Sequence, residues 1–285
     1  MTFAPKNRVT LDYIALRIVA TPEWADIVTA QLGELPFDTF EETEDGFNAY
    51  IRAQDWNDDL EAEVRDMTQM FPFSYTATRI ESQNWNAVWE ANFEPVRIGD
   101  FVNIRAEHHP AVADVRFDLL VQPKMAFGTG HHETTHMVVS MMEKINFADQ
   151  QVFDYGCGTG ILAIVAAKLG AAHIDAVDIE LPSYESTLEN CHINNVTNIS
   201  AFFGDINAVP LAQYGIILAN INRNVIVASL DALHKRAKSN AIILFSGFLT
   251  EDEPILLAAF APLGWQHQQT IQRGKWLAMR VAKAV

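Results

Sequence analysis

Three glycines at alternate positions, Gly156, Gly158 and Gly160, form a loop between a predicted strand at 152–155 and a predicted helix at 160–169. Glycine lets the backbone turn sharply and lets a ligand approach main-chain N–H groups. The amino end of the helix that follows favours electron-rich groups. This combination predicts a site for a nucleotide-like cofactor.

The spacing of this loop and a neighbouring acid separate two classes of cofactor. A dinucleotide-binding turn has the spacing Gly-x-Gly-x-x-Gly, and its third glycine is missing here. Asp154, two residues before the first glycine, could bind a cationic ligand tail. We therefore expect Asp154, Gly156 and Gly158 to bind S-adenosylmethionine, with an ordinary strand-to-helix turn as the alternative.

The next predicted strand, 173–178, ends on an acid. Asp178 follows Gly156 by 22 residues, where a βαβ unit places a carboxylate on ribose hydroxyls. Asp175 lies inside the strand pattern, where we expect it to be solvated or locally bonded. Glu180 remains ambiguous and could be a surface acid. Asp178 is therefore the expected ribose ligand.

A second glycine-bearing segment, 125–135, precedes the first. Phe127 offers a ring beside flexible backbone at Gly128, and we expect both residues at the cofactor. Thr134 and Thr135 are expected to start a helix, where a hydroxyl can cap N–H groups or touch a ligand. The glycines would also permit this loop to act as a mobile lid, with a static loop as the alternative.

Histidines in the same segment could suggest a metal site. His131, His132 and His136 have no acid or cysteine nearby at a standard zinc spacing, so we expect no metal. His132 is expected to be a hydrogen-bonded loop residue.

The composition is that of a soluble globular protein long enough for two domains. The 285 residues are 49% hydrophobic and carry a formal net charge of −16, which disfavours binding to nucleic acids and would attract a basic protein. Cys157 and Cys191 suggest neither a disulfide framework nor a metal site. No signal peptide or membrane-spanning run is evident, so we expect a cytoplasmic protein.

The first part of the chain, 1–80, predicts a separate α+β domain of the ferredoxin-like type. It holds 15 Asp or Glu and 6 Lys or Arg, which gives either a docking face for a basic partner or a solvated acidic surface. Strands and helices are expected in the order β-α-β-β-α-β, over 11–20, 22–35, 37–42, 47–51, 56–70 and 73–80.

Residues 81–100 predict a connector, in which Trp85, Trp89 and Phe93 would share one helix face. Within 101–285, strands and helices alternate from about residue 150, which indicates an α/β domain with a parallel, doubly wound sheet. Strands are expected at 152–155, 173–178, 200–203, 215–220 and 241–246, helices at 160–169, 183–194, 223–237 and 252–261, and closing strands at 266–272 and 276–281. By analogy, this closing hairpin predicts a Rossmann-like, seven-stranded class I methyltransferase domain.

Several motifs resemble those of the PrmA family of ribosomal protein methyltransferases. The two that carry most of the resemblance are 126–135 (AFGTGHHETT) and 154–164 (DYGCGTGILAI). Segments 84–95 (NWNAVWEANFEP), 219–221 (ANI) and 246–247 (SG) also match, so the resemblance covers nearly the whole chain.

The resemblance implies methylation of large-subunit ribosomal protein eleven, with S-adenosylmethionine as the cofactor and a small N-terminal domain that grips the substrate. By position it implies cofactor contacts at Thr135, Gly156, Asp178 and Asn220. The chain departs from the family at Gln122-Pro123-Lys124, where Asp-Pro-Gly is usual, at Pro182, and in the run after Asn220.

We therefore expect a protein N-methyltransferase that acts as a monomer on lysine side chains, an N-terminal amine or both. The attacking amine must be neutral, and Asn220 at a strand end is expected to orient it. A strand-end cap is the alternative role for Asn220.

Two other functions remain as alternatives. A release-factor glutamine or amino-purine DNA methyltransferase would have Asn/Asp-Pro-Pro-Tyr at 220–223, where this chain has Asn-Ile-Asn-Arg. A non-catalytic adaptor could bind ribosomal proteins through its acidic domain, but the intact cofactor motifs argue against it. A dinucleotide oxidoreductase lacks the required glycine spacing.

Overall fold

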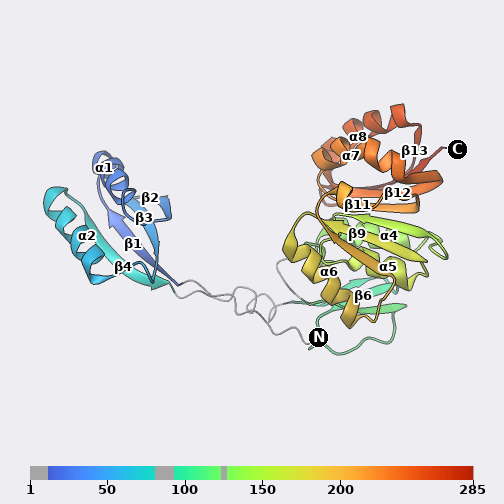
Figure 1. The fold of residues 1–285 in the computed structure, drawn as a ribbon, viewed down its shortest axis with the longest axis horizontal. Helices are drawn as coiled ribbons and strands as arrows, with labels where there is room; N and C mark the ends of the chain where they lie inside the picture. Colours follow the sequence, from blue (N-terminus) through green and yellow to red (C-terminus); the bar gives the residue numbers. More distant parts are fainter. Residues whose placement is uncertain (1–11, 81–92, 123–126, 285) are drawn as a thin grey trace. The chain divides into compact units, whose positions relative to one another are not determined.

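The computed structural model describes residues 12–80, 93–122 and 127–284. The chain divides into two compact units, Met1–Trp85 and Asn86–Val285 (Figure 1). Each unit has its own hydrophobic core. The predicted contacts of Trp85 and Trp89, and most of the Gln122-Pro123-Lys124 departure, lie outside the described residues.

The first unit contains one four-stranded antiparallel sheet with two helices. The strands lie in the order β2-β3-β1-β4. Alternate side chains of β1 and β3 are buried and pack against both helices. The elements are β1 (Tyr13–Val19), α1 (Pro22–Leu32), β2 (Thr39–Thr43), β3 (Gly46–Arg52), α2 (Asp58–Met70) and β4 (Ser74–Ile80), in the order that the sequence predicts.

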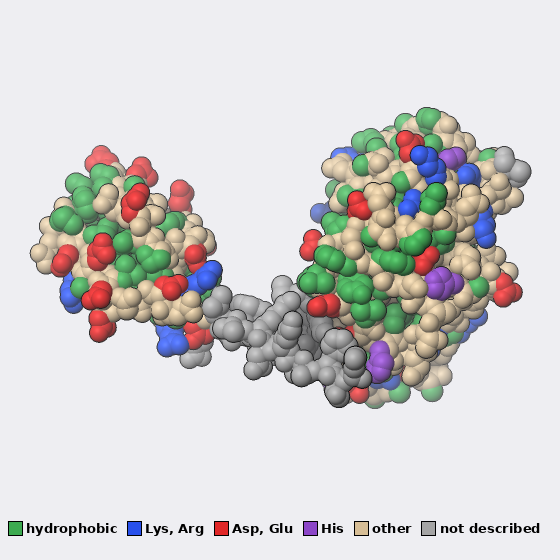
Figure 2. Space-filling view, in the orientation of Figure 1, with side chains coloured by type: hydrophobic (Ala, Val, Ile, Leu, Met, Phe, Trp, Pro, Cys, Tyr) green, Lys and Arg blue, Asp and Glu red, His purple; other side chains and the backbone are tan. Residues whose placement is uncertain are grey.

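Part of the acidic excess of this unit stabilises a helix. The side chain of Asn57 caps α2 by accepting hydrogen bonds from the N–H groups of Asp59 and Leu60. Asp58, Asp59 and Glu61 lie in the first turn, where negative charge interacts favourably with the helix dipole. Figure 2 shows Asp and Glu spread over the visible face of this unit rather than gathered in a single patch.

The second unit is built on a seven-stranded sheet in the order β10-β9-β8-β11-β12-β14-β13. Strand β14 runs antiparallel to the other six strands, which are parallel to one another. The predicted seven-stranded, Rossmann-like sheet is therefore confirmed. Its strands are β8 (Gln151–Tyr155), β9 (His173–Asp178), β10 (Ile199–Phe203), β11 (Tyr214–Asn220), β12 (Ala237–Leu249), β13 (Trp265–Arg273) and β14 (Trp276–Lys283).

Helices cover both faces of this sheet (Figure 1). One face packs against α4 (Glu133–Met142), α5 (Ile161–Lys168) and α6 (Leu181–Ile193). The other packs against α7 (Arg223–Arg236) and α8 (Glu253–Phe260). Neighbouring side chains of each strand point to opposite faces of the sheet, so Asp154 of β8 points to the face opposite to that of Phe153 and Tyr155.

A three-stranded sheet precedes the large one and is absent from the sequence prediction. It consists of β5 (Val96–Ile98), β6 (Val102–Arg105) and β7 (Phe117–Leu120), and its apolar side chains join the core under α4 and α5. Strand β5 lies within the range expected to be connector.

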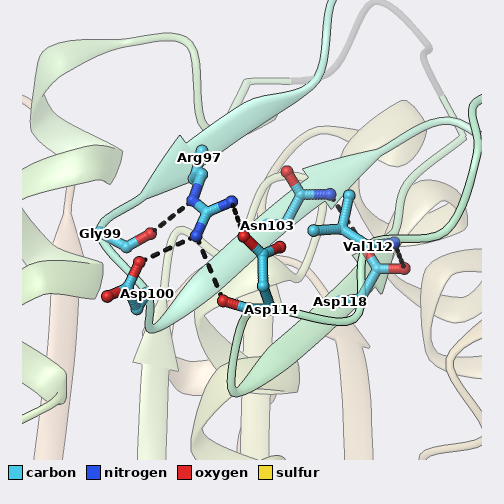
Figure 3. Close-up of polar contacts among 7 residues, drawn as sticks. All are labelled: Arg97, Gly99, Asp100, Asn103, Val112, Asp114 and Asp118. Atoms are coloured by element: carbon cyan, nitrogen blue, oxygen red, sulfur yellow. Dashed lines mark hydrogen bonds and ion pairs between the residues drawn. The ribbon is translucent and has the colours of Figure 1, made fainter.

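Ion pairs fix the turns of this small sheet (Figure 3). The guanidinium of Arg97 donates to the carbonyl oxygen of Gly99 and to the carboxylates of Asp100 and Asp114. Asp118 accepts from the side-chain amide of Asn103 at 2.8 Å and from the N–H of Val112 at 3.3 Å. These contacts tie the loops between the three strands to the sheet.

No helix of the described residues is long and apolar enough to cross a membrane.

Candidate active site

A cavity of about 380 Å³ lies at the carboxyl ends of the parallel strands. Residues at or just after the ends of β8, β9, β10 and β11 line it, together with Gly247 of β12. Ligands of open parallel sheets bind at this edge, near the point where the strand order reverses. The volume falls within the range of small-molecule sites.

The glycine loop packs too tightly for side chains at two of its positions. Gly156 and Gly158 have φ values of +77° and +56°, in the region that favours glycine. A Cβ on Gly156 would lie 2.2 Å from Cγ2 of Ile221, and one on Gly158 would lie 2.2 Å from the carbonyl oxygen of Phe127. Both glycines, which the sequence predicts to bind the cofactor, line the cavity.

Asp178 lies at the end of β9 and lines the cavity. Its two carboxylate oxygens accept hydrogen bonds from the N–H groups of Gly158 and Glu180, each at 2.9 Å. These bonds fix the carboxylate and leave further lone pairs, which can accept from sugar hydroxyls. Glu180, left ambiguous above, also lines the cavity.

Asn220 ends β11 and is only 7% exposed, yet it lines the cavity. Its amide nitrogen donates to the hydroxyl of Thr135 at 3.2 Å. Its Oδ1 is buried and has no hydrogen-bond partner among the described residues. An unpaired buried acceptor is costly, so a donor that reached this oxygen from the cavity would stabilise the site. Thr135 does not line the cavity itself, but its hydroxyl bonds the Asn220 side chain, which does.

Asp154 does not line the cavity, in contrast to the expected contact with a cationic tail. It is fully buried, and its Oδ2 accepts from the N–H of Ala163 in the first turn of α5 at 3.1 Å. Burial raises the pKa of this carboxyl to about 7. The period of β8 explains the difference, because side chains of 153 and 155 point to the other face.

Three aromatic rings form one wall of the cavity. Phe127 is 51% exposed, and its ring centroid lies 5.1 Å from that of His132. His132 in turn lies 4.7 Å from Trp276, the first residue of β14. The sequence prediction includes Phe127 but misses Trp276, since only the fold brings a residue of the final hairpin to this edge. Gly128, also predicted to bind the cofactor, does not line the cavity.

The helix that the sequence predicts to start at Thr134 and Thr135 begins one residue earlier. Helix α4 starts at Glu133, and its cap is the His132 ring, whose Nδ1 accepts from the N–H of Thr134. The threonine hydroxyls therefore do not cap the helix. His132 is hydrogen-bonded, as expected, and within 12–80, 93–122 and 127–284 no group of His, Cys, Asp or Glu is arranged to hold a metal ion.

Apolar side chains that the sequence analysis did not single out line another part of the cavity. Val177, Ile179 and Val225 contribute to it, and Ile179 is 64% exposed. An apolar surface next to a carboxylate at the end of β9 suits a purine beside its ribose. Pro182, a departure from the family pattern, lies in the first turn of α6, where proline is tolerated.

Comparison with known proteins agrees with this geometry. The family model described as ribosomal protein L11 methyltransferase (PrmA) matches residues 21–284. The chain belongs to this family. Proteins named ribosomal protein L11 methyltransferase from Porphyromonas gingivalis and Chlorobaculum tepidum are 37% and 35% identical to it. The alignments cover 90% and 95% of this chain, and 89% and 97% of those proteins.

A solved structure has the same fold. The crystal structure of ribosomal protein L11 methylase from Lactobacillus delbrueckii subsp. bulgaricus superimposes with a TM-score of 0.62 and 24% sequence identity. The superposition covers 68% of this chain and all of the methylase chain. This likeness shows a shared fold.

Membership of the PrmA family makes this chain a methyltransferase whose cofactor is S-adenosylmethionine. The cavity fits that cofactor by its chemistry. It combines an apolar surface, a fixed carboxylate on Asp178 and an unpaired acceptor on Asn220. These groups match an adenine, ribose hydroxyls and an ammonium or amine donor, respectively.

Proposed function

We propose that this PrmA-family chain transfers methyl groups to amino groups of ribosomal protein L11, on lysine side chains, the N-terminal amine or both. The relatives' names supply the substrate. The structural observation that carries the proposal is that Asn220, which lines the cavity, has a buried side-chain oxygen, Oδ1, without a hydrogen-bond partner among the described residues. An amine N–H is the donor that this acceptor lacks.

Cofactor binding is proposed to involve Gly156, Gly158, Asp178 and Asn220, with Phe127 at the edge of the cavity. Bound S-adenosylmethionine supplies a methyl group on an activated sulfonium. The protein then has mainly to position the acceptor and exclude water. Thr135 contributes by fixing the Asn220 amide rather than by direct contact.

The acceptor amine must be neutral when it attacks. Asn220 Oδ1 accepts a hydrogen bond from the amine and thereby directs the nitrogen lone pair, while the apolar and aromatic walls disfavour the charged ammonium form. We assign no side chain as general base, and the proton leaves to solvent. Asn220 is thus proposed as the catalytic residue that orients the nucleophile.

The first unit is proposed to be a ferredoxin-like substrate-recognition domain. Its order of elements and its excess of acids over bases support this role, since a basic ribosomal protein is attracted to negative charge. We further propose that the protein acts as a monomer in the cytoplasm. Both cysteines are free and buried, which agrees with a reducing compartment.

The local structure after Asn220 argues against a planar amide or base as the acceptor. Asn222 caps α7 by accepting from the N–H of Val225 at 3.1 Å, and Arg223 pairs with Asp252 at 2.6 Å. Both side chains therefore stabilise the start of α7 and do not form the proline-aromatic clamp of glutamine and amino-purine methyltransferases.

The deciding experiment combines the purified chain, labelled S-adenosylmethionine and ribosomal protein L11. We expect label in L11, located by mass spectrometry on amino groups. Asn220→Ala is the matched control and should bring the incorporation close to background. Label on glutamine side chains, or none with the wild-type chain while it binds the cofactor, would contradict the proposal.

A further inference from the structure

The two glycine-bearing loops are joined through one residue, Thr159. Its N–H donates to the carbonyl oxygen of Phe127 at 2.9 Å, and its hydroxyl donates to that of Gly128 at 2.8 Å. Gly158 lets the chains approach, because a Cβ there would lie 2.2 Å from the Phe127 oxygen. The cofactor loop and the loop that carries Phe127 therefore form one hydrogen-bonded unit.

Thr159 is itself held from the opposite side by α6. The side-chain amide of Asn190 donates to the carbonyl oxygen of Thr159 at 2.8 Å, and its Oδ1 accepts from the N–H of Gln122 at 2.9 Å. Thr159 and Asn190 are both fully buried. In such surroundings an unmade hydrogen bond is costly, so this arrangement strongly favours one position of the loop.

The contacts of Thr159 bear directly on the wall of the cavity. Phe127 lines the cavity and packs next to His132, which packs against Trp276. Thr159 lines no part of the cavity. Its hydroxyl therefore does not contact a molecule in the cavity and acts on it through the loops that it joins.

We propose that Thr159 is a positioning residue for the methyl acceptor. Its hydroxyl holds Phe127 and the aromatic wall in register with the cofactor loop, so that the acceptor amine meets a fixed wall. This inference rests on the proposed methyl transfer to a protein amine. It also replaces the expected mobile lid by a loop that is bonded to the cofactor loop.

Three variants of the full-length protein separate positioning from stability. Thr159→Val removes the hydroxyl and keeps the shape, whereas Thr159→Ser keeps the hydroxyl. Thr187→Val is the matched control, because the buried Thr187 hydroxyl donates to the carbonyl oxygen of Gly158 at 3.0 Å but has no bond to residues 127–130. Each variant is measured for cofactor Kd, for acceptor KM and kcat, and for thermal midpoint.

We expect Thr159→Val to lower kcat/KM for the acceptor by about tenfold, the factor that corresponds to one hydrogen bond of ~1.4 kcal/mol. The cofactor Kd should change by less than about threefold, which is under ~0.7 kcal/mol. Thr159→Ser should restore the acceptor kcat/KM, and Thr187→Val should leave it at the wild-type value. An unchanged acceptor kcat/KM in Thr159→Val, or equal losses for cofactor and acceptor, would overturn the positioning role.

Amide hydrogen exchange provides a readout that does not depend on activity. In Thr159→Val, residues 127–136 should exchange faster than in the wild type, while Thr187→Val should leave them unchanged. Equal exchange in Thr159→Val and wild type would refute the link between the loops. If the wild type failed to methylate L11, the proposed function would be wrong, and this measurement would still decide whether Thr159 holds the loop.

Discussion

The side chains of Asn220 and Thr135 form a hydrogen bond of 3.2 Å between the end of β11 and the first turn of α4. The bond uses the amide nitrogen of Asn220, so the Oδ1 atom of the same side chain is left without a partner among the described residues. Thr135, which lines no part of the cavity, thereby fixes the orientation of the Asn220 side-chain carbonyl group. Two residues that match separate motifs thus act together.

Removing either partner should affect methyl transfer to different extents. We expect Asn220→Ala to lower kcat by about 100-fold or more, on the scale of a lost transition-state hydrogen bond. Thr135→Val should cost about tenfold, since the amide stays but loses its orientation. Steady-state kinetics of both single variants and the double variant test this. Because both act on one group, the double variant should lose little beyond Asn220→Ala, and additive losses would contradict the relationship.

The carboxylate of Asp178 should determine cofactor affinity. Asp178→Ala is expected to weaken S-adenosylmethionine binding by about 1.5–3 kcal/mol, the scale of charge-assisted hydrogen bonds. Part of the loss would come from the freed N–H groups of Gly158 and Glu180. Isothermal titration calorimetry measures it. Asp175→Asn is the control, because Asp175 bonds the Tyr214 hydroxyl away from the cavity and should leave the Kd unchanged.

The close contact at Gly158 gives a prediction with an internal reference. Gly158→Ala would place a Cβ 2.2 Å from the Phe127 oxygen, whereas Gly264→Ala would meet nothing within 4 Å. Both glycines have positive φ, +56° and +68°, so both variants carry the left-handed strain of about 1–2 kcal/mol. Only Gly158→Ala should also lose cofactor binding and methyl transfer. Similar activities of the two variants would show that the loops tolerate separation.

Much of the second unit follows from local sequence patterns. Helix 223–237 is observed as α7, Arg223–Arg236, and the predicted strand 173–178 has the bounds of β9. Both segments combine a regular spacing of apolar and polar residues with a length typical of their type of element. The three-stranded sheet was missed because β5, with three residues, is too short to show a period.

The site itself was only partly predictable. Glycines and an acid after buried strands indicate Gly156, Gly158 and Asp178, because their roles depend on local position. Trp276 and Ile179 join the cavity through tertiary packing, for which one sequence carries no signal. Asp154 shows the opposite limitation, since its type suggested a ligand contact while the face of β8 sends it into the core.

The first unit should be dispensable for cofactor binding and necessary for the protein substrate. Deleting residues 1–80 removes a unit with its own sheet and core, so the remainder should fold and bind S-adenosylmethionine. We expect it to lose activity on L11, because the acidic unit is the proposed docking domain. Circular dichroism, calorimetry and the labelling assay test the three expectations. Full activity of the truncated chain on L11 would show that docking lies elsewhere.

The buried carboxyl of Asp154 should make stability depend on pH. Burial, with a smaller contribution from the charge of Asp178, raises its pKa from 3.8 to about 7, although the bond from Ala163 opposes this. Below about pH 4 the group is protonated in both the folded and the unfolded chain. Between about pH 4 and pH 7 only the folded chain retains the proton. The stability that this protonated carboxyl group provides is therefore lost as the pH rises through this range.

Asp154→Asn should therefore remove this dependence. An amide of the same size carries no charge at any pH. The free energy of unfolding of the variant, relative to that of the wild type, should therefore rise by on the order of 3 kcal/mol from about pH 5 to about pH 8. Thermal or denaturant unfolding at both pH values measures the difference. The exposed Glu185→Gln on α6 is the control and should leave the pH dependence as it is in the wild type. A wild-type dependence that persists in Asp154→Asn would show that other groups cause it, and that Asp154 is ionised in the folded protein well below neutral pH.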